Sequence, residues 1–399
     1  MTFKERMLAA VRGEGVDELP WAPRLDLWYR ANSRAGTLPG QYRGASLREI
    51  VEDMGVGMHA VVPDFRDLRG PEDEVDRALG IYNLKSMPYG TVLENVERVA
   101  RYEGDTTKVE YLTPAGRLTT RVLYDERMRE AGVSLTHVSE HLIKSVDDFE
   151  AAGYLFENAG VLPNYEGYSE FASEVGDRGL AVGFVSLAAS PMHLIQRELM
   201  PLDQFFYAMH DCPEALARLA ERIEVYWRQV MDVAVNCPAE VIFVGANYDA
   251  SVTHPPFFRE HILPWLQTYS KALHERGKYL LTHTDGENTG LLQCYLDAET
   301  DVADSICPAP MTKLSFGEVR EAFAGRVTIM GGIPSIALLK SSMSDYEFDA
   351  FLDDFFLQIG SGDRLILGIS DTTPPGADFG RLVRIGRRAK EFGLVMGAM

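Results

Sequence analysis

The stretch YLLTHTDGEN, residues 279–288, places an imidazole and two carboxylates directly after an apolar run. His283 and Asp285 are two residues apart, and Glu287 follows after two more. In an extended chain, residues i and i+2 point to the same side. These side chains can therefore converge on one point, where they would hold a metal ion, move a substrate proton or bind a neighbouring backbone group.

Polar side chains also follow other apolar runs in the second half of the chain. They are Ser186 and Ser190, then Asn247, Tyr248 and Asp249, then Cys307, and finally Ser370 and Asp371. Taken singly, each is best explained as a residue that caps a strand or fixes a loop. Carboxylates after several runs, close to one histidine, instead favour a shared site. Cys307 is best interpreted as a small buried hydrophobe, with a soft metal ligand as the alternative.

The runs that carry these residues alternate with helical patterns. Six apolar runs are predicted as strands, at 180–187, 239–247, 278–283, 301–307, 326–333 and 363–370. Between them, segments such as 213–236, 255–277 and 343–360 repeat apolar residues every three or four positions. Strands that are apolar throughout are typical of a parallel sheet covered on both faces. The pattern favours a (β/α)8 TIM-type barrel, with a doubly wound sheet as the second choice.

The first half is less regular. Residues 58–65, MHAVVPDF, resemble an early barrel strand. Between about 100 and 125, polar and apolar residues alternate around the turn TPAG, which predicts an inserted β-hairpin that forms a flap near one mouth. We find no repeat or long linker, so residues 1–399 are expected to form a single domain.

Composition excludes several classes of partner. The chain carries 39 Lys and Arg against 59 Asp and Glu, a net charge of −20. Such a surface repels nucleic acid and anionic membranes. No apolar run reaches the roughly 20 residues of a membrane helix, and residues 1–15 lack a signal-peptide core. The four cysteines show no CxxC spacing. A cytoplasmic protein with neither nucleic acid nor membrane as partner is expected, and a homodimer is one option for its oligomeric state.

Several segments together resemble the uroporphyrinogen decarboxylase superfamily over most of the chain. They are RMLAAVRGEGVDELPWAP, NYDASVTHPPFFREHILPWL, HTDGEN, VTIMGGIPS and LILGISDTTPP. The resemblance implies a single TIM-like barrel. The porphyrin decarboxylase itself carries an Arg-rich segment that grips carboxylates. Here RANSRAGTLPGQYR keeps Arg30 and Arg34, but AGTLP stands where the decarboxylase pattern has AGRYLP, so the arginine after the glycine is missing. This difference favours the corrinoid-linked methyltransferase branch.

The same resemblance implies a metal site. In thiol-alkylating members, zinc is held by His-x-Cys-Gly and a later Cys. His283 matches the histidine, Asp285 the first cysteine and Asp371 the second, and Cys307 is a further candidate ligand. One imidazole with two carboxylates is a harder ligand set than two thiolates and suits an oxygen that must be polarised. Zinc is expected, while an oxygen-rich site also suits Mg²⁺ or Mn²⁺.

The resemblance thus implies a methyltransferase that demethylates a small methylated substrate, with a methoxylated one expected, and passes the methyl group to cobalamin on a corrinoid partner protein. The candidate catalytic residues are His283, Asp285, Asp249 and Tyr248. The candidate substrate-binding residues are Asn247, Arg30, Arg34, Glu287 and Ser370. One alternative is a cofactor-independent decarboxylase, a lyase that acts on a carboxylated substrate held by the arginines. The other is a non-catalytic binding barrel whose acidic residues only cap strands.

Overall fold

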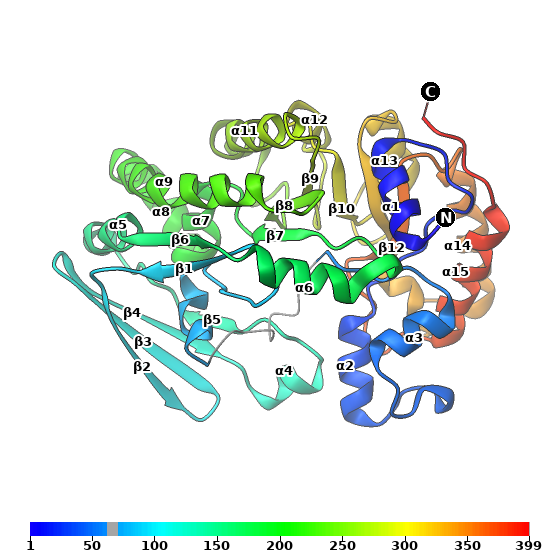
Figure 1. Cartoon of the computed structure of the whole chain (residues 1–399), viewed down its shortest axis with the longest axis horizontal. Coiled ribbons are helices and arrows are strands. Elements are labelled where there is room, and N and C mark those ends of the chain that lie inside the picture. The colour runs from blue at the N-terminus through cyan, green and yellow to red at the C-terminus, as the bar shows by residue number, and fades with distance from the viewer. Residues whose placement is uncertain (62–70, 399) are drawn as a thin grey trace.

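The computed structural model describes residues 1–61 and 71–398. Its centre is a six-stranded parallel sheet with the order β12-β11-β10-β9-β8-β7 (Figure 1). The strands are β7 Gly183–Ser186, β8 Val241–Ala246, β9 Tyr279–His283, β10 Val302–Ile306, β11 Thr328–Pro334 and β12 Leu365–Ser370. They confirm the six predicted runs. Five of the six are buried along their whole length, as strands covered on both faces must be.

Helices connect these strands, and one more helix follows the last strand. They are α7 Pro191–Leu194, α8 Leu202–Asp211, α9 Pro213–Asn236, α10 Pro255–Phe257, α11 Leu263–His274, α12 Leu292–Asp297, α13 Phe316–Phe323, α14 Asp345–Ile359 and α15 Phe379–Phe392. Two π turns, η5 Ile195–Leu199 and η6 Phe258–Ile262, and a 3-10 turn, η7 Ser335–Leu338, lie among them. The predicted helix at 255–277 is therefore interrupted by a π turn, where the helix widens before Pro264 in the first turn of α11.

The first half of the chain supplies shorter helices. They are α1 Phe3–Arg12, α2 Asp26–Ala35, α3 Leu47–Met54, α4 Glu126–Glu130, α5 Phe149–Glu157 and α6 Tyr165–Val175, with 3-10 helices η1 Gly40–Tyr42, η2 Pro71–Leu79, η3 Val146–Asp148 and η4 Gly176–Arg178. Side-chain caps begin α1, α3 and α4. Thr2 and Glu5 form a reciprocal capping box at α1, and α1 ends at Gly13 in a left-handed conformation.

The predicted hairpin is present. Strands β3 Thr106–Thr113 and β4 Gly116–Leu123 pair antiparallel, with Thr113 opposite Gly116 across the turn. The hairpin belongs to a larger sheet, order β2-β3-β4-β5, in which β2 is Glu97–Glu103 and β5 is His137–Glu140. A separate pair joins β1 Tyr89–Leu93 to β6 Ala159–Pro163. Figure 1 places the four-stranded sheet on the opposite side of the molecule from α14 and α15.

Both edges of the parallel sheet are hydrogen-bonded to segments from the first 61 residues. At the β12 edge, Ala22 N donates to Leu367 O at 2.8 Å. At the β7 edge, Val182 N donates to Ala60 O at 3.1 Å. The two segments also meet each other, because Gly57 N donates to Trp21 O at 2.8 Å. The strand predicted at 58–65 lies partly outside the described residues, and its described part, 58–61, forms a bridge and no full strand.

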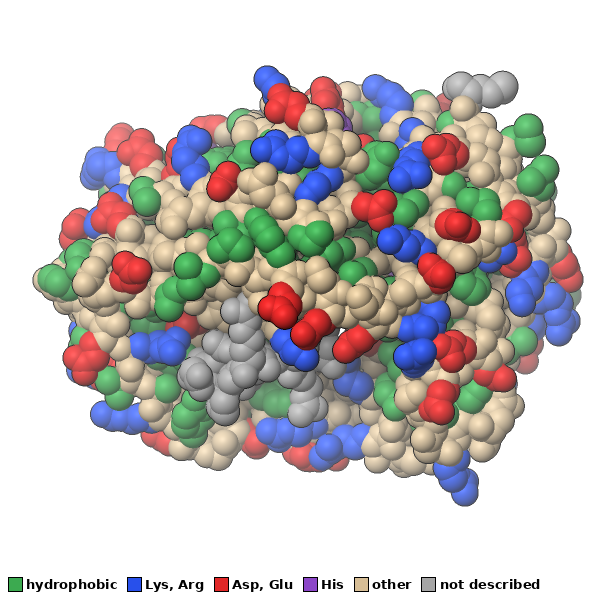
Figure 2. Space-filling view, in the orientation of Figure 1, with side chains coloured by type: hydrophobic (Ala, Val, Ile, Leu, Met, Phe, Trp, Pro, Cys, Tyr) green, Lys and Arg blue, Asp and Glu red, His purple; other side chains and the backbone are tan. Residues whose placement is uncertain are grey.

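The surface carries many charged side chains, as the composition predicts. In Figure 2, Lys and Arg side chains are interspersed with Asp and Glu side chains over the face shown. Of the described helices, none combines the length and the apolar character that a membrane crossing requires.

Candidate metal centre and pocket

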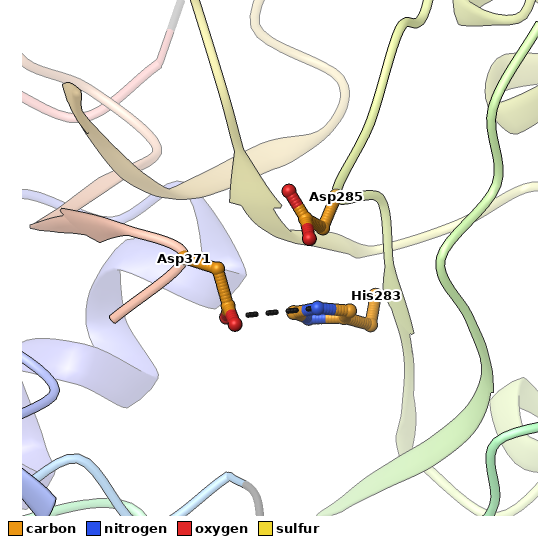
Figure 3. Close-up of side chains that lie close together, drawn as sticks. All are labelled: His283, Asp285 and Asp371. Carbon is orange, nitrogen blue, oxygen red and sulfur yellow. Dashed lines mark ion pairs between the residues drawn. The ribbon is translucent and has the colours of Figure 1, made fainter. Parts of the chain in front are cut away.

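Three side chains with metal-binding atoms meet at the C-terminal ends of β9 and β12. His283 is the last residue of β9, Asp285 follows two residues later, and Asp371 comes directly after β12. One ligand atom from each lies within 4.8 Å of the others, and His283 Nε2 is 3.6 Å from Asp371 Oδ1. Figure 3 shows the imidazole and both carboxylates pointing toward one another. The structure thus brings together the three residues that the sequence predicted as a metal site.

A third carboxylate, Asp304, fixes the orientation of the imidazole. Asp304 on β10 lies 2.9 Å from His283 Nδ1 through its Oδ2. That contact leaves Nε2 facing Asp371 and Asp285, as a metal-binding histidine requires. The other oxygen of Asp304 lies 3.7 Å from His59 Nε2. Asp304 itself is 1% exposed, so its charge is held by these two histidines.

The close carboxylates change the pKa values of the group. Burial lowers the pKa of His283, but the charges of Asp371 and Asp304 outweigh it, so the pKa is raised. Burial raises the pKa of Asp285, and the neighbouring Asp371 adds to the effect. Burial also opposes ionisation of Asp304, yet its hydrogen bond with His283 holds its pKa below the ordinary range. The group therefore has excess negative charge that a bound cation would neutralise.

A chain of ion pairs leads from Asp371 through Arg24 and Asp26 to Arg30. Arg24 donates from its NH1 to Asp371 Oδ1 at 2.9 Å and from its Nε to Asp26 Oδ1 at 3.1 Å. Arg30 donates to Asp26 Oδ2 at 2.9 Å and to Gly132 O at 2.8 Å. Burial disfavours ionised Asp26, but the two arginines lower its pKa to about 2. Arg24 therefore holds Asp371 in place beside His283.

A pocket of about 240 Å³ opens beside these residues. Its charged and polar lining comes from Arg24, Asp26, Arg30, Ser134, Arg197, Asn247, His283, Asp371 and Thr372. Its apolar lining comes from Leu27, Val133, Leu135, Leu187 and Phe243. Residues 133–135 belong to the connection between α4 and β5. This connection, and not the predicted hairpin flap, is what reaches the pocket from the four-stranded sheet.

Other predicted site residues hold loops around the pocket. Asn247 lines it, and its N–H donates to His283 O at 3.0 Å. Asp249 accepts from Ser251 N at 2.8 Å and from Glu287 N at 3.0 Å. Glu287 in turn accepts from Thr289 N and Lys313 N, each at 2.9 Å.

The remaining candidates lie away from the pocket lining. Tyr248 is fully buried, and its hydroxyl accepts from Thr282 at 2.9 Å. Ser370 is buried and links Gly332 N to Ile306 O. Arg34 is exposed and pairs with Glu126. The structure does not bring these three to the metal-binding group, so their roles in binding or catalysis stay predictions.

Cys307 lies close to the group without joining it. Burial raises the pKa of its thiol to about 12, and Asp285 and Asp371 act in the same direction. Its Sγ is 3.8 Å from the Met311 sulfur. A thiol held protonated in this way is a poor metal ligand, which favours the interpretation of Cys307 as a buried hydrophobe.

Sequence reasoning missed three residues near the site, Asp304, Asp26 and Arg197. Asp304 had a visible signal, because it is a carboxylate inside a predicted strand, 301–307. Arg24 is one of the arginines between 24 and 43 that would orient a carboxylate in a lyase, but nothing in the spacing of Arg24 or Asp26 links them to residue 371. Arg197 had no signal, since it follows a short helix and lies on a π turn.

Comparison with known proteins shows similarity in structure but none in sequence families. No protein-family model matches this chain, and no curated protein matches it in sequence. Solved structures do match it, among them a methyltransferase from Methanosarcina mazei, with a TM-score of 0.53 and 15% sequence identity over 98% of this chain and 99% of that chain. At this identity the match shows a shared fold, and the chemistry must be argued from the residues of the site.

Proposed function

We propose that this chain is a methyltransferase that removes a methyl group from an oxygen of a small substrate and passes it to a corrinoid on a partner protein. The observation that carries the proposal is the group of His283, Asp285 and Asp371 at the edge of a ring-sized pocket. The methyltransferase named among the similar structures supports the general reaction class.

We also infer that the parallel sheet closes into a single (β/α)8 barrel. The hydrogen bonds of Ala22 to Leu367, of Val182 to Ala60 and of Gly57 to Trp21 support this, because they link both sheet edges through two extended segments. A doubly wound sheet would leave its two edges apart. In a barrel, the C-terminal ends of the strands form the catalytic mouth, and His283 and Asp371 lie at such ends.

The donor atoms fit a divalent metal ion. The 3.6 Å between His283 Nε2 and Asp371 Oδ1 is close to the roughly 3.4 Å that separates two ligands of a tetrahedral zinc ion. Three protein ligands leave a fourth position for substrate, as in catalytic zinc sites. When bound, zinc or another hard divalent ion would act as a Lewis acid toward the oxygen that leaves.

The chain's own residues prepare that chemistry. Asp304 orients His283, and Arg24 orients Asp371. Arg24 also lines the pocket, where its positive charge would stabilise an oxygen that becomes an alkoxide or phenoxide. Phe243 and Leu187 provide an apolar wall that keeps water from the reacting bond.

The methyl acceptor lies on another protein. A reduced corrinoid supplies the nucleophile when its carrier protein docks, so this chain needs no nucleophile of its own. The carbon–oxygen bond of the substrate would break, the corrinoid would accept the methyl group, and the leaving oxygen would keep the electron pair and take a proton from water. The role of the chain is to align the methyl group with the incoming acceptor.

A decarboxylase is the second candidate. The arginines that line the pocket, Arg24, Arg30 and Arg197, favour it because they would orient a carboxylate. Such a lyase would use the His283–Asp304 pair for proton transfer and would need no metal.

One experiment separates the two. The protein is purified without chelators, its metal content is measured, and it is mixed with chemically reduced cobalamin and a panel of methoxylated aromatic compounds. We expect bound zinc and the appearance of methylcobalamin, with both lost in Asp371→Ala. Full activity in metal-free protein, or release of CO₂ without methyl transfer, would overturn the proposal.

A further inference from the structure

We propose that the substrate of this pocket carries a carboxylate, and that Arg197 binds it. The inference rests on the proposed function for the identity of the site, and it deepens that function by naming the chemical class of the substrate. It assigns Arg197 as a specificity-determining residue at the end of the pocket away from Asp371.

The sheet order separates Arg197 from Asp371. Asp371 follows β12, at one edge of the parallel sheet, and His283 ends β9. Arg197 NH1 donates to Ala246 O at 3.3 Å, and Ala246 is the last residue of β8. Arg197 therefore lies beyond His283 on the β8 side, while Asp371 lies on the β12 side. A substrate that spans the pocket would touch both.

Arg197 also retains unused hydrogen-bonding capacity. Its Nε forms an ion pair with Glu198 Oε1 at 3.2 Å, but that carboxylate is shared with other donors. Glu198 is already bound by Arg77 at 2.6 Å and by the Tyr82 hydroxyl at 3.3 Å. Among the described residues, Arg197 donates one hydrogen bond, the long one from its NH1 to Ala246 O at 3.3 Å.

The other arginines of the pocket are committed to protein carboxylates. Arg24 binds Asp26 and Asp371, and Arg30 binds Asp26. Because Arg77 already pairs with Glu198, the carboxylate that Arg197 contacts, Arg197 is the lining arginine best able to bind a further anion. A guanidinium presents parallel N–H groups that match the two oxygens of a carboxylate. The π turn that carries it, Ile195–Leu199, is a local irregularity of the kind found at functional sites.

The volume and the lining of the pocket narrow the class of substrate further. The pocket holds about 240 Å³, and a protein cavity of about 150 Å³ is known to hold benzene. Leu135, Leu187 and Phe243 contribute apolar lining to it. A small ring or a chain of similar size fits this wall, with the carboxylate at Arg197 and the methylated oxygen at His283 and Asp371. The substrate class is therefore a small methoxylated carboxylic acid.

Calorimetric binding tests the inference without methyl transfer. The probes are 4-methoxybenzoate and its neutral counterpart, 4-methoxybenzamide, titrated into wild-type protein, Arg197→Met and Arg197→Lys. The matched control is Arg228→Met, an exposed arginine on α9 that pairs with Glu224. We expect the acid to bind wild type and the control alike. Arg197→Met should weaken binding of the acid by about 10–100-fold, the range for hydrogen bonds to charged groups, and leave binding of the amide unchanged. The affinity of Arg197→Lys for the acid should lie between those of wild type and Arg197→Met, because lysine keeps the charge and loses the paired donors.

Each other outcome is decisive. Equal binding of acid and amide by wild type, equal losses for both probes in Arg197→Met, or no binding of the acid at millimolar concentration overturns the inference. Circular dichroism and thermal melting check that each variant is folded, and the lysine variant keeps the test valid if the methionine variant is not. If the acid binds through Arg197 but reduced cobalamin is never methylated, the carboxylate site stands and the proposed function fails.

Discussion

His283 and Asp304 are register partners on neighbouring parallel strands, β9 and β10, and their side chains meet with 2.9 Å between Nδ1 and Oδ2. Partners of this kind orient a metal-binding histidine and make it more basic, and their loss costs about 10–100-fold in metal affinity. We expect Asp304→Asn to weaken zinc binding by that factor, as measured by competition with a chelator. Asp301→Asn is the control, since Asp301 also binds a histidine, His274, outside the pocket. Equal losses in both variants would contradict the assignment.

Replacing one hard ligand by a soft one should separate metal binding from chemistry. Asp285→Cys is expected to retain zinc, because thiolates bind it well. The site becomes more electron-rich, so methyl removal from oxygen should slow by at least about tenfold. Metal analysis and the rate of methylcobalamin formation check the two halves. A variant that loses zinc but keeps its rate would sink the metal mechanism.

Zinc affinity should increase as the pH rises. In the metal-free protein, Asp371 and Asp304 overcome burial and raise the pKa of His283, and burial raises the pKa of Asp285. Both groups must lose their protons to bind metal. Below the raised pKa of His283, protons therefore compete with zinc, and above it that competition ends. Zinc Kd measured across roughly pH 5 to 8, the range in which histidines titrate, should fall with increasing pH, with protons released into weakly buffered solution. A pH-independent Kd would be the contrary result.

Ser370 should matter for stability more than for binding. Its hydroxyl donates to Ile306 O and accepts from Gly332 N, which ties β12 to the ends of β10 and β11. Ser370→Ala leaves those buried backbone groups without a partner, at a cost of about 1–3 kcal/mol in the free energy of unfolding. Urea denaturation measures this loss, and the affinity for 4-methoxybenzoate should not change. Weaker ligand binding with unchanged stability would instead support the substrate-binding role that the sequence predicts.

Local patterns made the second half of the fold predictable. The predicted helix at 213–236 coincides with α9, because Pro213 stands at its first turn and apolar residues recur along its buried face. The fully apolar strands were equally visible. In contrast, β2 is mostly exposed and shows no apolar face, so the sheet around the hairpin was underestimated.

Only the part of the site that follows from spacing along the chain or from the family resemblance was predictable. His283 and Asp285 are two residues apart, and the family resemblance added Asp371. Asp304 required the register between β9 and β10, and Arg197 required the position of a π turn against β8. Such relationships depend on tertiary packing, which a single sequence does not display.

The ion pair between Arg24 and Asp371 joins residues 347 positions apart, and this has a consequence for biosynthesis. At about 5–20 residues per second, Arg24 leaves the ribosome roughly 20–70 seconds before its partner. The same delay applies to Ala22, because the carbonyl of Leu367 that accepts its hydrogen bond is synthesised equally late. The nascent chain must therefore keep its early segments from aggregating throughout elongation. A ribosome stalled before β12 would release a protein with neither a finished sheet nor the Asp371 carboxylate beside His283.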